Sequence, residues 1–150
     1  MGGPCPAHGE RSMAKTVELE LGVTFTRDEI HRLLGGQVQI YLPYVDGKVV
    51  CGCFDPSDKM NPAAPEEILF GEPHDTPKID ETADMVFEQG QAGDPIPVFL
   101  KRSVNNWEYM GEYLCIGITR DERIVRRKMA KYPHRRRFTG VLRFERVWPE

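Results

Sequence analysis

The sequence predicts an α+β domain built as a small, mostly antiparallel β-barrel with two or three short helices. The main observation is a pair of stretches, residues 97–102 and 107–118, in which apolar and polar side chains alternate as they do in strands. The short polar loop between them makes the pair a β-hairpin. Other strand-like segments are also joined by turns and outnumber the helical segments, which favours a barrel over a crossover fold.

The first segments are a lead-in, a strand and a helix. Residues 1–14 are mostly Gly, Pro and polar residues, so we expect a disordered lead-in before a single domain over residues 15–150. Alternation over residues 17–21 predicts the first strand. Thr26 and Glu29 have the spacing of a capping box, in which each side chain satisfies a free backbone amide at a helix start. A pair of glycines ends this short helix.

The next segments predict two strands and a long loop. Residues 38–42 alternate as a strand, which Pro43 ends. The dipeptide Asp46-Gly47 is a strong hairpin-turn signal, so residues 48–54 are the returning strand. Three prolines in residues 55–65 predict an extended loop.

Two helices and a closing strand complete the prediction. Apolar residues at helical spacing predict a helix over residues 80–89 that packs on the sheet. Thr119 and Glu122 have the spacing of a second capping box, which predicts a basic helix over residues 120–130. Residues 140–147 alternate imperfectly and predict the closing strand.

Charge is distributed unevenly along the chain. Residues 1–119 carry a net charge of −10 and residues 120–150 a net charge of +7, which together give −3. Nine of the cations lie between residues 120 and 137. A basic block of this kind binds polyanions even on an acidic protein, because the local field depends on local charge. The alternative is a solvated charged face that is paired with the acidic part of the same chain.

Composition bounds the location of the protein. No apolar run approaches the roughly 20 residues of a membrane helix, and the N-terminus lacks the apolar region of a secretory signal. We therefore expect an intracellular protein, cytoplasmic or nuclear, without a membrane partner.

The cysteines and histidines do not form a metal-binding pattern. Cys51 and Cys53 point to the same face of a strand, but a zinc site needs two more ligands, and only His74 and Cys115 are in plausible reach. We expect free thiols, no metal and no cofactor.

The motifs of common enzyme classes are absent, so we expect a protein that is not an enzyme. There is no phosphate-binding Gly-rich loop, no Gly-x-Ser-x-Gly elbow and no His-Glu-x-x-His. Asp55, Asp58 and Lys59 have the composition of a nuclease metal site, but a solvated loop is the simpler interpretation. A small hydrolase that uses Asp55 and His74 is a weaker alternative.

Two motifs carry a resemblance to a known family. Residues 97–113 contain Pro-Val-Phe-Leu-Lys-Arg, followed by Asn106-Trp-Glu-Tyr-Met-Gly-Glu-Tyr113. A charged run followed by aromatic-x-Tyr-x-Gly-x-Tyr resembles the hairpin of SRA (YDG) domains and their PUA-like relatives. Ile68-Leu-Phe-Gly-Glu72 resembles the Gly-Glu element of SRA-like modules attached to bacterial restriction endonucleases. The resemblance covers residues 68–147 and includes neither the segment before Ile68 nor a nuclease domain.

The resemblance implies a non-catalytic domain that binds nucleic acid, with DNA the expected partner and a partner nuclease elsewhere. SRA-like domains flip a modified base into an aromatic pocket, where a carboxylate or amide bonds its edge, while basic loops hold the phosphates. The residue types that match the pocket are Tyr41, Phe54, Asp55, Asn61, Trp107 and Tyr109. Those that match the phosphate contacts are Lys101, Arg102, Arg120, Arg123, Arg126 and Arg127.

A different function class stays open from the residues alone. Trp107, Tyr109 and Tyr113 also fit a simple core-filling role, in which case the acidic face would bind a protein partner. The two functions are a reader of nucleic acid and a protein-interaction or regulatory domain without a nucleic-acid role. The residues do not indicate which base or modification is read, nor whether DNA or RNA is bound.

Overall fold

The computed structural model describes residues 19–71, 77–135 and 137–147, which form a curved sheet with helices on both faces. The predicted lead-in over residues 1–14 lies outside the described residues. The strands of the sheet follow the order β4-β6-β7-β8-β5, with β1 paired to the start of β7. Only the β4-β6 pair is parallel, so the α+β class and the mostly antiparallel sheet are confirmed.

The elements follow one another in a simple order. The main-sheet strands are β1 (Thr24–Phe25), β4 (Gly52–Phe54), β5 (Glu67–Phe70), β6 (Ile96–Ser103), β7 (Asn106–Thr119) and β8 (Gly140–Val147), and β2 (Tyr44–Val45) with β3 (Lys48–Val49) forms a separate hairpin. The helices of the described chain are α2 (Arg27–Leu34), α3 (Pro77–Gln91) and α4 (Glu122–Lys131). None of them is long and apolar enough to cross a membrane.

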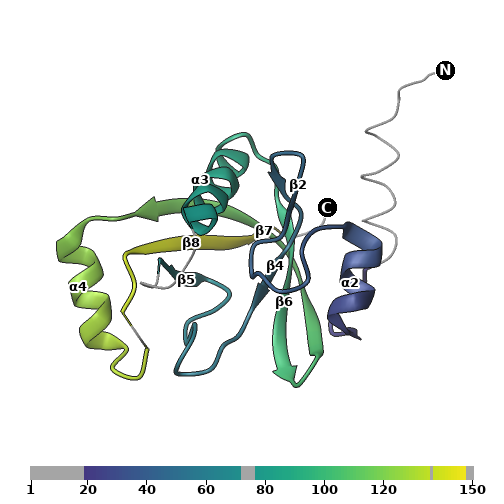
Figure 1. The fold of residues 1–150 in the computed structure, drawn as a ribbon, viewed down its shortest axis with the longest axis horizontal. Helices are drawn as coiled ribbons and strands as arrows, with labels where there is room; N and C mark the ends of the chain where they lie inside the picture. Colours follow the sequence, from purple (N-terminus) through teal and green to yellow (C-terminus); the bar gives the residue numbers. More distant parts are fainter. Residues whose placement is uncertain (1–18, 72–76, 136, 148–150) are drawn as a thin grey trace.

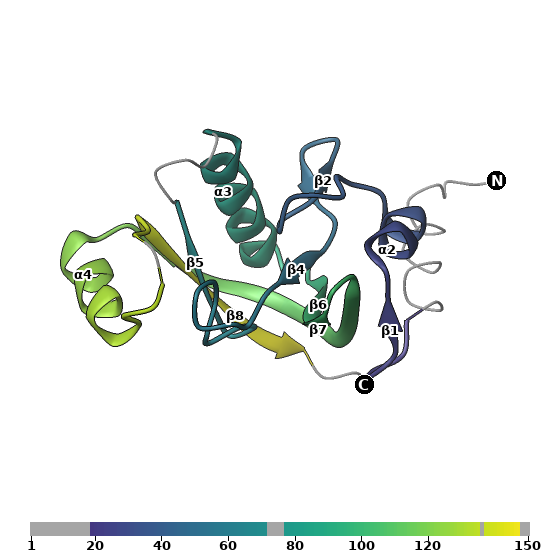
Figure 2. The same cartoon turned by 60° about the horizontal axis from the view of Figure 1, so that its bottom comes forward.

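The helices divide the core into three parts. Figures 1 and 2 show α2 and α4 at opposite ends of the sheet, with α3 between them. The main cluster, which includes Phe54, Phe70 and Phe144, lies between the sheet and α3. Two smaller clusters lie under α2, around Phe99, and under α4, around Phe138. The sheet therefore buries apolar side chains on both faces.

A bulge in β7 decides which face its buried side chains take. Tyr109 pairs with Phe99, but Gly111 pairs with Val98, so one extra residue stands in β7. Gly111 has a φ of +114°, which a residue with a side chain rarely adopts. Because of this step, Tyr109 points toward α2 whereas Tyr113 points toward α3.

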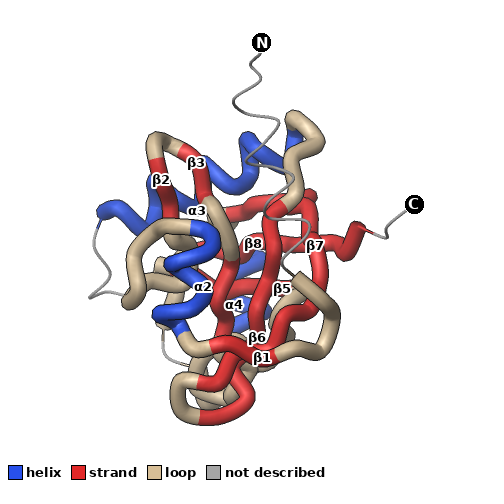
Figure 3. Tube along the Cα trace, turned by 90° about the vertical axis from the view of Figure 1, so that its right-hand side faces the viewer, coloured by secondary structure: helices blue, strands red, loops and turns tan. Residues whose placement is uncertain are grey.

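The barrel prediction is wrong in one respect, because the sheet is not closed. Within the described residues β4 and β5 are its two edges and do not pair with each other. Both are short, and the loop of residues 55–66 connects them. Figure 3 shows the paired strands β6 and β7 of this sheet side by side. In this loop the buried side chain of Asn61 accepts a hydrogen bond from the Leu69 N–H.

Several local predictions are confirmed. The hairpin of β6 and β7, the strand β8 and the helix α3 form where the sequence places them. Thr26 and Glu29 make both hydrogen bonds of the capping box of α2. Asp46 and Gly47 have φ values of +52° and +78°, as a two-residue hairpin turn requires.

Other local predictions are wrong. Residues 38–42 form turns and bends rather than a strand, because the Arg27 side chain occupies the Ile40 carbonyl that a strand would use. The described residues 19–21 are not a strand, and residues 17–18 lie outside the described chain. Asp121, rather than Thr119, caps α4 by accepting a hydrogen bond from the Arg123 N–H.

The contact between α3 and β7 leaves no room for a side chain at Gly90. A methyl group there would overlap the carbonyl oxygen of Cys115. We expect Gly90→Ala to lower the free energy of unfolding by about 1–3 kcal/mol, because overpacking forces the helix from the sheet. Gly117→Ala is the control, since its added methyl would make only ordinary contacts. Urea unfolding measures both, and equal stability of the two variants would contradict the described contact.

Candidate nucleic-acid interface

Helix α4 is fixed to the sheet by its apolar side. Val125 is buried against Leu69, Phe138 and Val141. At the helix end, Lys128 and Tyr132 both donate hydrogen bonds to the Glu67 carboxylate, at 2.7 and 3.0 Å. This leaves the opposite side of the helix to solvent.

The outer side of α4 carries a row of arginines. At 100° per residue, Arg126, Arg123 and Arg127 fall in one sector of roughly 100°. Arg123 and Arg126 make only long, exposed ion pairs with Asp121 and Glu122, at 3.8 and 3.6 Å. Arg127 has no carboxylate partner in the described part of the chain. Exposed pairs contribute little, so these cations stay available to an anion.

Two other predicted phosphate contacts are compensated within the protein. Arg120 forms ion pairs with Asp84 and Asp80 of α3, at 3.1 and 3.3 Å, and lies over the Phe70 ring. Arg102 donates a 2.6 Å hydrogen bond to Glu108 across the β6-β7 hairpin. Lys101, the remaining predicted contact, is half-buried on β6.

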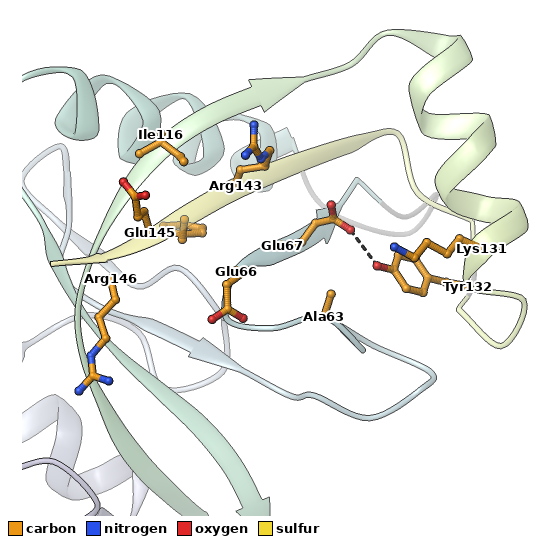
Figure 4. Close-up of a pocket in the computed structure, with 10 residues that line it drawn as sticks. Ala63, Glu66, Glu67, Ile116, Lys131, Tyr132, Arg143, Glu145 and Arg146 are labelled. Carbon is orange, nitrogen blue, oxygen red and sulfur yellow. Dashed lines mark hydrogen bonds between the residues drawn. The ribbon is translucent and has the colours of Figure 1, made fainter.

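A wide hollow lies between α4 and the sheet. It measures about 680 Å³ and is shown in Figure 4. Arg143 lies opposite Glu67 in the β5-β8 pair, and both line this hollow and a neighbouring one of about 410 Å³. Burial and the Glu67 carboxylate raise the pKa of Tyr132 to about 12, so its hydroxyl keeps its proton and donates to Glu67.

Four of the six predicted pocket residues come together at the end of β4. The Phe54 ring is fully buried between Tyr41 and Phe144, with centroids 6.5 and 5.8 Å away. The Asp55 carboxylate accepts a hydrogen bond from the Ser57 N–H, and the Asp55 carbonyl accepts one from the Asn61 N–H. Phe54 and Asn61 are structural here, whereas Tyr41 and Asp55 keep partly exposed surface.

The other two pocket residues lie on the opposite face of the sheet. Trp107 is 8% exposed and packs under the Arg27 guanidinium, whose central carbon lies 5.1 Å from the ring centroid. Tyr109 packs on Phe99, and its hydroxyl donates a 2.7 Å hydrogen bond to Glu112. Burial raises the pKa of Tyr109. The structure therefore does not bring all six residues into one pocket.

The three cysteines of the described residues are buried. Cys51, Cys53 and Cys115 are free thiols, and burial raises the pKa of Cys115 to about 11. Over residues 19–71, 77–135 and 137–147, no group of three His, Cys, Asp or Glu side chains is arranged to hold a metal ion.

Sequence reasoning missed two sets of residues. Glu67 and Tyr132, which fix α4, carry no local motif that could have found them. Arg27 and His31, which stand four residues apart on α2, form a hydrogen bond of 2.9 Å. Their spacing could have indicated this contact, because side chains four residues apart are neighbours on a helix.

A family model described as a domain of unknown function, DUF6697, matches residues 24–138. The chain belongs to this DUF6697 family. No curated protein matches the sequence at a significant level.

Two of the solved structures similar to this DUF6697 domain contain SRA domains. The complex of the SUVH5 SRA domain with hemimethylated CG DNA has a TM-score of 0.56 at 16% identity, covering 89% of this chain and 93% of that one. The sulfur-binding and SRA domains of ScoMcrA, complexed with phosphorothioated DNA, give 0.51 at 17%, covering 89% and 41%. The DNA modification-dependent restriction endonuclease AspBHI gives 0.52 at 13%, covering 89% and 43%. The DUF6697 domain thus shares the SRA fold, as its hairpin motifs predict.

Burial of Trp107 generates a stability prediction. Truncating a buried tryptophan removes its packing and leaves a cavity, so we expect Trp107→Ala to lower the free energy of unfolding by roughly 3–5 kcal/mol. Val104→Ala in the same hairpin is the control, because Val104 is 88% exposed. Chemical denaturation measures both. A Trp107→Ala protein as stable as the control would mean that the indole is not a core residue.

Proposed function

We propose that the DUF6697 domain is a non-catalytic DNA-binding domain that holds the phosphate backbone with α4. The observation that carries the proposal is the arginine row on the outer side of α4, on a fold shared with domains solved on DNA. Guanidinium groups bind phosphate oxygens through paired hydrogen bonds, and α4 presents Arg123, Arg126 and Arg127 in one direction.

The separation of charge supports this role. The exposed acids Asp80, Glu81 and Asp84 lie on α3, which covers a different part of the sheet from α4. Arg120 bridges to two of these acids, so it contributes less to phosphate binding than the α4 row. Arg102 is also paired with a carboxylate, that of Glu108. With Lys101 it makes the β6-β7 hairpin a secondary phosphate contact.

We place base recognition at the end of β4. Tyr41 is a partly exposed aromatic residue and Asp55 a partly exposed carboxylate, and these are the kinds of group that stack on a flipped base and bond its edge. Phe54 and Asn61 support these two residues from below, through the ring contact and the hydrogen bond described above. Trp107 and Tyr109 support the far face of the same sheet.

A partner nuclease belongs to the proposal. The ScoMcrA and AspBHI chains are more than twice the length that this chain spans in them. A reader without catalytic residues acts through an enzyme that cuts or modifies the DNA it marks. The location we propose is intracellular, where DNA is found.

A protein-interaction domain is the second candidate function. The observation that favours it is a set of exposed apolar side chains on and near α2, namely Leu21, Val23, Leu33, Val38 and Val45. Such surfaces mark protein contacts more often than nucleic-acid contacts.

Salt dependence of DNA binding tests the proposal. Changing Arg123, Arg126 and Arg127 together to Ala removes three phosphate contacts. We expect the slope of log affinity against log salt to flatten by about 2.7, at about 0.9 per lost contact. Fluorescence anisotropy with a labelled 20-base-pair duplex measures it.

The control for the triple variant removes the same charge elsewhere. Arg32, Lys48 and Lys78 are exposed and lie on α2, β3 and α3. Their joint change to Ala should leave the salt slope unchanged. If both triples weaken binding equally, the effect is net charge alone and α4 is not the interface. If the parent protein binds no duplex at all, the second candidate function takes its place.

Base recognition has its own test. Asp55→Asn keeps an oxygen for the Ser57 N–H but removes the carboxylate charge, so the loop should stay folded. Asp58→Asn in the same exposed loop is the matched control. We compare affinities for unmodified and hemimethylated CG duplexes. A reader at Asp55 should lose about 1–3 kcal/mol of discrimination between duplexes, the contribution of one good base contact. Discrimination that survives Asp55→Asn would exclude this site.

A further inference from the structure

Arg27 joins three separate segments of the chain through one side chain. Its Nη2 donates to the carbonyls of Ile40 and Gln37, at 2.8 and 3.1 Å. Its Nε donates to His31 Nε2 at 2.9 Å, and the guanidinium lies over the Trp107 ring. The start of α2, the turn of residues 37–40 and strand β7 thus meet at one group.

The contacts of His31 fix its protonation state. His31 Nδ1 lies 2.8 Å from the Gly35 carbonyl oxygen, which can only accept, so Nδ1 carries a proton. Nε2 accepts the hydrogen bond from Arg27 Nε, so it carries none. The ring is therefore the neutral Nδ1–H tautomer. A second proton would set an N–H group of His31 against the N–H group of Arg27.

The turn of residues 37–40 depends on Arg27 because it makes no strand pairing. Its side chains at residues 37–39 are exposed, and the segment runs directly into Tyr41. Beyond the turn, the Tyr41 carbonyl accepts a 2.9 Å hydrogen bond from the Cys53 N–H of β4. A shift of the Ile40 carbonyl is therefore transmitted to Tyr41 by a single peptide unit.

We propose that Arg27 is a positioning residue for the base-reading site, and that neutral His31 is the acceptor on which its hold depends. Protonation of His31 breaks the Arg27–His31 hydrogen bond, loosens the guanidinium from the Ile40 and Gln37 carbonyls, and frees the turn that leads into Tyr41. Arg27 does not touch the base itself. We call the hydrogen bonds of Arg27 to His31, Gln37 and Ile40 the clamp. The link to base reading rests on the proposed function, whereas the clamp is a property of the folded protein alone.

The groups around His31 set the pH range of the clamp. Burial is the largest influence and lowers the pKa of His31; Arg27 lowers it further, while the Gly35 hydrogen bond and Asp28 raise it. Asp28, His31 and Arg32 line one surface hollow, in which Arg32 adds positive charge near His31. The net result is a pKa below the usual 6.5. The clamp is intact above pH 6.5, and its contribution to stability is lost as the pH falls from 6.5 through the lowered pKa.

Tryptophan fluorescence of the full chain tests the clamp without DNA. The sequence has two tryptophans, so in a Trp148→Phe background the emission comes from Trp107 alone. We expect the emission of Trp107 to titrate between pH 8 and 5 with a midpoint below 6.5, as the guanidinium leaves the ring. His31→Gln offers an uncharged acceptor to Arg27 and should abolish this transition. His134→Gln, at an exposed position, should leave it unchanged.

Two results would overturn the clamp. One is an emission of Trp107 that does not change over this pH range. The other is a transition that persists in His31→Gln, since it would then arise from another group.

DNA affinity tests the link to the base-reading site. Between pH 7.5 and 5.5 the preference of the parent for a hemimethylated duplex over an unmodified one should fall, because His31 takes up a proton and releases Arg27. The same preference in His31→Gln should be constant. If Trp107 emission titrates through His31 but the preference does not change, Arg27 does not position the reader. If no duplex binds, the proposed function fails and the fluorescence alone decides on the clamp.

Discussion

The structure depends on one extra residue in β7, at the bulge before Gly111. Without it, the odd-numbered side chains from Trp107 to Cys115 would all face the same side of the sheet. With it, Trp107 and Tyr109 form the layer under α2, while Tyr113 and Cys115 form the layer under α3. A single sheet can therefore bury aromatic side chains on both faces and carry helices on both. The positive φ of Gly111 makes this switch possible without strain.

Local signals predicted local structure, and long-range contacts explain where prediction failed. The capping box at Thr26 and the turn at Asp46 each depend on residues within three positions, so they could be found from the sequence. The strand expected over residues 38–42 is absent where the side chain of Arg27, 13 residues before Ile40, takes the Ile40 carbonyl. The six pocket candidates had suitable chemistry, but Trp107 and Tyr109 lie on the face of Phe99, opposite to that of Phe54. The bulge at Gly111 then moves Tyr113 to the Phe54 face. No pattern in the sequence marks that bulge beyond the glycine itself.

The cations behave differently according to what faces them. Arg120, at the end of β7, lies close enough to α3 for two carboxylates to hold it. Arg127, less than two helical turns further along, projects from the outer side of α4. It meets no carboxylate in the described chain. The sequence shows nine cations in one block, and only the fold separates those that stabilise the protein from those left to bind an anion. The buried Arg135, whose guanidinium donates to the Leu69 carbonyl, belongs to the first kind.

The proposed phosphate helix and the proposed base-reading loop share one support, which is β5. Glu67, at the start of β5, holds Lys128 and Tyr132 of the α4 end. Two residues later, the Leu69 N–H donates to Asn61, in the loop that carries Asp55. The two parts of the interface are thus attached to the same short strand by hydrogen bonds with little access to solvent. A reader that flips a base must keep its pocket at a set distance from the phosphates it grips, because the flipped nucleotide remains tethered to that backbone. A four-residue edge strand, paired along its length to β8, provides that fixed spacing where a flexible loop could not.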